Sequence, residues 1–130
     1  MVMRRFLFIL ILSACAYLTS CSQQTFATAS SDGITCTLSF SAPLVANQSI
    51  PVIVQFTRDG QYVSIADVAL DLQMPGMTMG SSRPMAEAQS DGSHTANVLF
   101  TMDGEWSIVV TARSAQEPVR FVINHILVSP

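Results

Sequence analysis

Three methionines stand within six residues of the stretch Met74 to Gly80, which reads MPGMTMG. Their thioethers are soft, uncharged donors that suit Cu(I), and in an oxidising compartment they do not pair into disulfides as thiols do. The spacing Met-x-Met brings two sulfurs within reach of one ion. Pro75, Gly76 and Gly80 favour a turn or loop over a helix or a regular strand. The stretch is therefore a candidate Cu(I)-binding loop.

Further donors are expected to reach the same place if successive strands alternate in direction. The Asp103-Gly104 pair is a hairpin signal, which returns Met102 and Trp106 to the end of the fold where the loop lies. His125 stands about seven residues, or about 23 Å, along the last strand and is expected at that end too. Three sulfurs, or two sulfurs and an imidazole, suit a trigonal or tetrahedral Cu(I) site. The candidate metal ligands are Met74, Met77, Met79, Met102 and His125.

Other interpretations of these residues stay open. Methionine most often fills gaps in apolar interiors, so core packing also accounts for Met74 and Met102. An apolar cap, or an adaptable patch that docks a partner, also accounts for Met77 and Met79. An ordinary strand histidine accounts for His125. We expect Trp106 and Cys36 in the core and His94 at the end of the fold opposite the loop.

Alternation of apolar and polar residues with period two runs through most of the chain and indicates strands. No pattern indicates a helix, a repeat or a second domain. Seven short strands with turns every 8 to 12 residues predict an all-β protein, a seven-stranded immunoglobulin-like antiparallel β-sandwich. The expected strands are 34–40, 50–56, 68–74, 82–89, 96–100, 106–110 and 119–128.

The N-terminal segment is predicted to be an export signal. Arg4 and Arg5 precede the apolar run FLFILIL, and LTSC at 18–21 resembles a bacterial lipobox. We expect a lipoprotein signal over 1–21 with Cys21 lipidated, although LSAC at 12–15 fits the same pattern at Cys15, and ordinary secretion is a third possibility. Residues 22–33 are then a flexible tether and 34–130 the domain. By resemblance to Gram-negative lipoproteins, Ser22 rather than an aspartate after Cys21 favours the outer over the inner membrane.

Charge and missing motifs exclude several classes of function. After Cys21 the chain has 4 arginines, no lysine and 9 acidic residues, a formal net charge of 4 − 9 = −5. An acidic surface without a basic cluster argues against binding to nucleic acid or anionic lipid. Cys36 is the only cysteine left, so no intramolecular disulfide forms. The sequence has no G-x-S-x-G, no HExxH and no clustered acid pair, which indicates a binding module and not an enzyme.

Two segments carry a family resemblance. The run VALDLQMPGMTMG and the later run HTANVLFTMDGEWSIVV resemble the YtkA-like domain, which is related to the FixH proteins of bacterial oxidase assembly. The resemblance covers 34 to 128. It implies a small extracytoplasmic sandwich associated with copper handling, and it supplies no ligand set. A lipobox stands here where FixH proteins usually have a transmembrane anchor.

Together these features predict a periplasmic, lipid-anchored protein that binds Cu(I) for copper transfer or metal resistance. Its expected partners are the membrane, through the anchor, and an envelope metal-transport or oxidase-assembly protein. The alternative is a metal-independent interaction domain whose methionine tip docks on an envelope protein. Because the first predicted strand starts at Ile34, opposite the loop, the tether is expected to leave from the far end. The methionine loop would then face away from the membrane.

Overall fold

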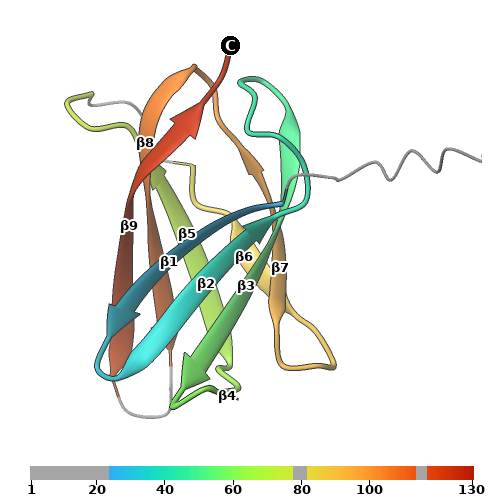
Figure 1. Ribbon diagram of the computed structural model, residues 1–130, viewed down its shortest axis with the longest axis vertical. Coiled ribbons are helices and arrows are strands. Elements are labelled where there is room, and N and C mark those ends of the chain that lie inside the picture. The colour runs from blue at the N-terminus through green and yellow to red at the C-terminus, as the bar shows by residue number, and fades with distance from the viewer. Residues whose placement is uncertain (1–23, 78–81, 114–116) are drawn as a thin grey trace, which may run out of the picture.

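The computed structural model describes residues 24–77, 82–113 and 117–130, and these ranges contain strands but no helix. Figure 1 shows an elongated, barrel-like body built from them. The strands are β1 (Thr25–Ser31), β2 (Ile34–Phe40), β3 (Ser49–Arg58), β4 (Gln61–Tyr62), β5 (Asp67–Gln73), β6 (Met85–Ala88), β7 (His94–Leu99), β8 (Gly104–Arg113) and β9 (Pro118–Val128).

Hydrogen bonds join the strands into one antiparallel sheet in the order β1-β2-β3-β7-β6-β5-β8-β9, with β4 paired to β3. The short strand β6 makes the sheet continuous, because Ala86 pairs with Val68 in β5 and Ala88 pairs with His94 in β7. The all-β antiparallel class is confirmed. The seven-stranded immunoglobulin-like sandwich is not, since the described residues form nine strands in a nearly closed sheet rather than two separate ones.

The core follows from the alternation that predicted the strands. Successive side chains of a strand point to opposite faces, so every second residue of β2, β3 and β5 is buried inside the barrel. The largest fully buried side chains are Phe40, Phe56, Phe100 and Phe121. Cys36 is also fully buried, as expected, and His94 opens β7 with 1% of its surface exposed. The barrel is therefore filled by side chains and is not a channel.

The expected flexible tether over 22–33 is wrong for most of its length. Residues Thr25–Ser31 form β1, which pairs with the whole of β2 from Thr25 opposite Phe40 to Ser31 opposite Ile34. The turn is made by Asp32 and Gly33, which both have positive φ angles of 52° and 75°. These angles fit the two-residue hairpin turn that a right-twisted strand pair prefers. The domain thus begins at β1 and not at Ile34.

The barrel has two ends, and they differ in which elements meet there. We call one the methionine end: it holds the end of β5, the β7–β8 hairpin and the end of β9, where Gly104 pairs with Val128. At the opposite end, Ile34 and Arg58 line a hollow together with Ile65 and Val119. Ile34 therefore lies at the end opposite the methionine loop, as predicted.

The expectation that the tether leaves from this far end is nevertheless wrong. Strand β1 runs antiparallel to β2 and carries the chain back over about 23 Å, the length of its seven residues, from Ile34 to Thr25. Thr25 pairs with Phe40, and in Figure 1 this start of β1 lies in the same half of the barrel as the end of β5. The described chain begins at the methionine end.

Several predictions lie outside this description. The predicted signal segment 1–21, with the alternative lipidation sites Cys15 and Cys21, precedes the described residues. Met79 falls in the gap 78–81. Within the described residues, no helix is long and apolar enough to cross a membrane.

Candidate functional site

The methionine loop begins with a tight turn. The backbone N–H of Met77 donates to the carbonyl oxygen of Met74 at 3.2 Å, so Pro75 and Gly76 occupy the two central turn positions. Gly76 has a φ of 79°, the value that the third position of a type II turn requires, and proline suits the second position. The MPGM sequence thus folds back on itself and places the first two methionines side by side at the end of β5.

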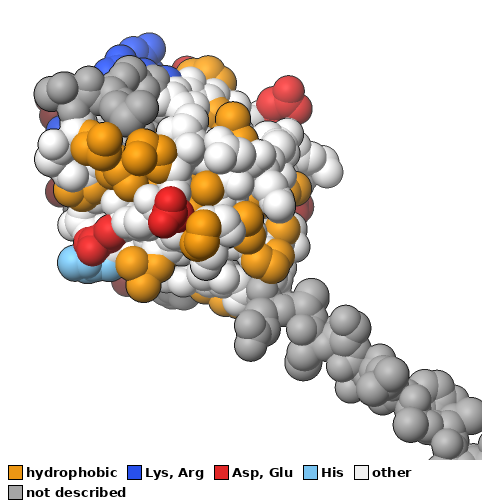
Figure 2. Space-filling view, turned by 90° about the horizontal axis from the view of Figure 1, so that it is seen from above, with side chains coloured by type: hydrophobic (Ala, Val, Ile, Leu, Met, Phe, Trp, Pro, Cys, Tyr) orange, Lys and Arg blue, Asp and Glu red, His pale blue; other side chains and the backbone are white. Residues whose placement is uncertain are grey.

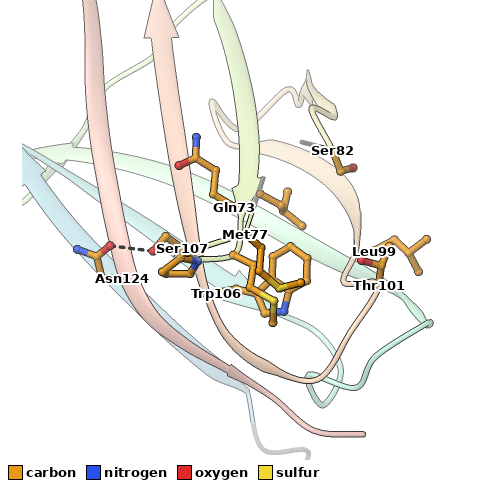
Figure 3. Close-up of a pocket in the computed structure, with 12 residues that line it drawn as sticks. Gln73, Met77, Ser82, Leu99, Thr101, Trp106, Ser107 and Asn124 are labelled. Atoms are coloured by element: carbon orange, nitrogen blue, oxygen red, sulfur yellow. Dashed lines mark hydrogen bonds between the residues drawn. The ribbon is translucent and has the colours of Figure 1, made fainter. Parts of the chain in front are cut away.

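These two methionines line a surface hollow of about 620 Å³ between the end of β5 and the start of β8. Figure 3 shows Met77 and Trp106 at its centre, with Leu99 and Thr101 on the β7 side and Gln73 on the β5 side. The hollow is lined by Leu72, Gln73, Met74, Pro75, Gly76, Met77, Ser82, Leu99, Thr101, Trp106, Ser107 and Asn124. It is the place in the described chain where two thioether side chains share one cavity wall.

Trp106 forms a rigid wall of this hollow. Its indole N–H donates to the carbonyl oxygen of Met102 at 3.0 Å, and its ring packs edge-on against Phe100 at 5.3 Å between centroids. Only 7% of its surface is exposed, which confirms the expected core position. Because both the polar and the apolar part of the ring are engaged, its orientation is fixed.

Met74 is held from the other side by the β7–β8 hairpin. Its side chain is half-buried and belongs to the edge of the core. Its terminal methyl lies 3.0 Å from where a Cβ atom would stand on Gly104, whose φ of 123° also favours glycine. The absence of a side chain at Gly104 therefore makes the room that Met74 occupies. Met77, in contrast, is 45% exposed and forms the outer lip of the hollow.

The structure brings together only part of the predicted ligand set. Met74 and Met77 share the hollow, and Met79 lies outside the described residues. The side chain of Met102 does not line the hollow and is 39% exposed, so core packing, the alternative interpretation of this residue, is wrong. The buried position of that segment belongs to Phe100. Met102 contributes its carbonyl oxygen to hold Trp106.

His125 does not join the methionines. Its ring faces solvent, with 83% of the side chain exposed, and its Nδ1 atom lies 2.6 Å from a carboxylate oxygen of Glu105. A register shift in the β8–β9 pairing between Trp106 and Ile108 leaves an extra residue in β9, where His125 takes a positive φ of 61°. Such a bulge redirects the side chains beside it. As a result Asn124, and not His125, lines the methionine hollow.

Sequence reasoning missed the polar side of the hollow. The Ser107 hydroxyl and the Asn124 side-chain oxygen are hydrogen-bonded at 2.9 Å across β8 and β9, which pins both side chains (Figure 3). Gln73 donates to Asp71 at 3.0 Å, and Asp71 also lies 3.6 Å from the guanidinium of Arg83 on the far side of the loop. The outward positions of Asp71 and Gln73 in the β5 alternation were the available signal.

The described residues contain no group of three or more histidine, cysteine, aspartate or glutamate side chains that could hold a metal ion. The thiol of Cys36 lies in the core, where burial raises its pKa from 9.0 to about 12 and keeps it protonated. Among the described residues, the soft donors that reach a surface hollow are the methionines.

Comparison with known proteins identifies the family. A family model described as YtkA-like matches residues 28–111, which is more than half of the 130 residues. The chain belongs to the YtkA-like family. The match starts inside β1 and ends inside β8, so it includes the turn Met74–Met77 and Trp106. No curated protein matches the chain.

Proposed function

We propose that this protein is a lipid-anchored periplasmic binding protein that carries Cu(I) at its methionine end. The observation that supports this proposal most directly is the shared hollow of Met74 and Met77 against Trp106. Membership of the YtkA-like family agrees with an extracytoplasmic module. The protein serves copper transfer or metal resistance, its anchor is Cys21, and it resides on the outer rather than the inner membrane.

The donor set fits Cu(I) better than other common ions. Two neutral sulfurs do not offset the charge of a divalent cation, and Zn²⁺, Mg²⁺ and Ca²⁺ take imidazole, thiolate or oxygen ligands instead. Trp106 adds the face of an indole ring, which attracts a cation electrostatically. Met79, two residues after Met77 and five after Met74 in the sequence, supplies the third sulfur in this proposal. His125 and the side chain of Met102 are not part of the ligand set.

The two methionines differ in a way that suits transfer. Met74 is half-buried and held by Gly104, so it forms a fixed inner ligand. Met77 is 45% exposed at the lip and is the ligand that a partner's donor replaces first. Neutral ligands exchange one at a time without leaving an unpaired charge. The recipient in this proposal is an envelope metal-transport or oxidase-assembly protein, and no catalytic step is involved.

The test is a titration of the purified domain with Cu(I) against a competing chelator. We expect one tight site that weakens at least tenfold in the Met74→Leu and Met77→Leu variants, which keep apolar volume but remove the sulfur. Met85→Leu is the matched control, because Met85 is 64% exposed on β6 and does not line this hollow. Unchanged affinity for Cu(I) in both the Met74→Leu and the Met77→Leu variants would contradict the proposal.

An apolar docking tip is the second candidate, and a separate observation favours it. Met77, Leu99 and Met102 are 45%, 44% and 39% exposed at the methionine end, and methionine-rich surfaces adapt to several partners. A pull-down from envelope extract in metal-free buffer distinguishes the two functions. In the docking function, Met77→Leu retains a partner and Met77→Asp loses it. In the copper function, Met77→Leu already weakens metal binding, because it removes the sulfur.

A further inference from the structure

We infer that the methionine end rests on the lipid surface of the membrane that anchors the protein, through a rim of exposed apolar side chains. The sequence alone pointed the other way, with the methionine loop turned outward. The inference rests on the proposed membrane attachment and does not require copper. It makes the lipid boundary itself the partner of this end of the barrel.

The first supporting observation is where the chain enters the barrel. Thr25 starts β1 at the methionine end, opposite Phe40. Between Cys21 and Thr25 stand only the residues Ser22, Gln23 and Gln24. Four peptide steps span at most about 14 Å when fully extended. A lipidated Cys21 therefore keeps the methionine end within about that distance of the membrane surface, and the opposite end a further strand length away.

The second observation is how apolar side chains are distributed. The described chain has eight large hydrophobic side chains that are exposed, and five of these belong to the methionine end. Figure 2 looks onto this end and shows hydrophobic groups spread over the face rather than gathered in one patch. The five are Phe26, Met77, Leu99, Met102 and Leu127, and we call them the apolar rim. Tyr62, Met85 and Val122 lie elsewhere on the barrel.

Phe26 and Leu127 are the most exposed members of the apolar rim, at 60% and 71%. They line one hollow between the starting half of β1 and the last part of β9, where the barrel is not closed by hydrogen bonds. Side chains this large are costly to leave in water, and an amphipathic surface of this kind inserts shallowly at the boundary between headgroups and acyl chains. Both side chains stand next to the point where the chain enters the barrel.

Charge at this end specifies the kind of lipid. Arg58 lines the hollow at the opposite end, and Arg113 stands opposite Asp67 and Pro118 in the strand registers at that same end. Near the methionine loop, the guanidinium of Arg83 lies 3.6 Å from Asp71. Asp103 and Glu105 lie in the hairpin region of the methionine end and give this end an excess of acidic side chains. Acidic side chains are repelled by anionic headgroups, so the contact is apolar and suits zwitterionic lipid. Its strength should change little with salt and fall when anionic lipid is added.

Trp106 offers a direct test because it is the only tryptophan of the chain and lies at the methionine end. The full anchored protein is reconstituted, without metal, into phosphatidylcholine vesicles that carry a nitroxide on the headgroup, which quenches nearby indoles. The matched control carries Trp106→Phe together with Tyr62→Trp, since Tyr62 is 74% exposed in β4 at the opposite end. We expect at least twofold stronger quenching of Trp106 than of the Tyr62→Trp reporter. Equal or reversed quenching overturns the inference.

A second variant separates contact from mere tethering. Phe26→Ser with Leu127→Ser should lower the quenching of Trp106 at least twofold while the anchor keeps the protein on the vesicles. Val122→Ser, also at an exposed position of β9, should leave quenching unchanged. If Trp106 is quenched equally in the parent protein, the Phe26→Ser/Leu127→Ser variant and the Val122→Ser variant, lipid contact by the rim is refuted. If quenching appears only when a membrane protein is added to the vesicles, the rim binds that protein. If quenching instead rises with protein concentration as the chains self-associate, the rim binds a second copy. Either result also refutes the inference.

The outcome is independent of the Cu(I) titration, because the quenching is measured without metal and the titration without lipid. If the quenching experiment fails, the Cu(I) proposal is unaffected, and if the titration fails, the lipid contact is unaffected. If both hold, the hollow of Met74 and Met77 opens beside the membrane surface. The exchange partner for Cu(I) then belongs to the same membrane and is not a protein reached across the periplasm.

Discussion

The terminal methyl of Met74 lies 3.0 Å from the place that a Cβ atom would take on Gly104. The contact joins the end of β5 to the start of β8 and sets how deep the inner thioether of the hollow lies. Gly104→Ala should therefore push Met74 outward and also strain the backbone at a φ of 123°. We expect a loss of about 1–3 kcal/mol in the free energy of unfolding and weaker binding of Cu(I). Chemical denaturation and the chelator titration measure the two effects.

Gly92→Ala is the matched control for this substitution. Gly92 also has a positive φ, 88°, but no atom lies within 4 Å of its would-be Cβ, and it stands at the Asp91–Ser93 turn before β7. It should lose stability to a similar degree and keep its affinity for Cu(I). Equal affinity loss in both variants would show that Met74 is displaced by general destabilisation and not by the contact.

Burial of Cys36 leads to a prediction about alkaline pH. Because its pKa is raised to about 12 in the folded protein, the thiol stays protonated where the unfolded chain, with a value near 9.0, already loses its proton. The unfolded state then binds fewer protons, so the free energy of unfolding falls as pH rises. The slope should approach about 1.4 kcal/mol per pH unit between pH 9 and 12. Urea unfolding at a series of pH values measures it.

Cys36→Ala isolates this effect from other alkaline titrations. The variant is less stable at neutral pH because it leaves a small cavity, but the difference between the two proteins should shrink as pH rises. Cys36 should also resist alkylation in the native protein and react after unfolding. Rapid alkylation without unfolding would contradict the buried position.

Strand β1 should be visible by hydrogen exchange. An extended tether exchanges its amides at the rate of an unstructured chain, whereas an edge strand protects those amides that bond to its one neighbour. We expect alternate amides of Thr25–Ser31 to be slowed by at least tenfold, since β1 pairs along its whole length with β2. Proline removes a backbone N–H, so in place of whichever of Thr28 and Ala29 donates to β2 it should break that hydrogen bond and speed exchange of the neighbouring β1 amides. Uniformly fast exchange over Thr25–Ser31 would contradict β1 and support a flexible tether.

Strand predictions succeeded where burial made the alternation strong. Phe40 and Phe56 each stand between polar neighbours in the sequence, and the predicted ranges match β2, β3 and β9 closely. Strand β1 was missed because its inward positions are only Ala27 and Ala29, which are small and partly buried against the core. The Asp32-Gly33 pair, followed by the strong alternation of β2, was the hairpin signal that could have found it.

The candidate site was predicted only in part, and the reason is a change of phase. In β9 the buried residues are Phe121, Ile123, Ile126 and Val128, so the alternation slips by one residue between 123 and 126. That slip marks the bulge and turns His125 to solvent. A count of residues along a regular strand could not place it. The pairing of Met74 with Met77 needed only the local turn chemistry of Pro75 and Gly76, which is why it was predictable.

The position of His125 gives the last prediction. His125 is 83% exposed, interacts with Glu105 and lies outside the methionine hollow, so removing its imidazole should not change the affinity for Cu(I). His125→Asn is the suitable substitution, because asparagine tolerates the positive φ of 61° at this bulge. The exposed pair with Glu105 contributes less than about 1 kcal/mol to stability, so the variant should unfold nearly as the parent does. A tenfold loss of Cu(I) affinity, comparable to that of Met77→Leu, would instead return His125 to the ligand set and require β9 to rearrange around the ion.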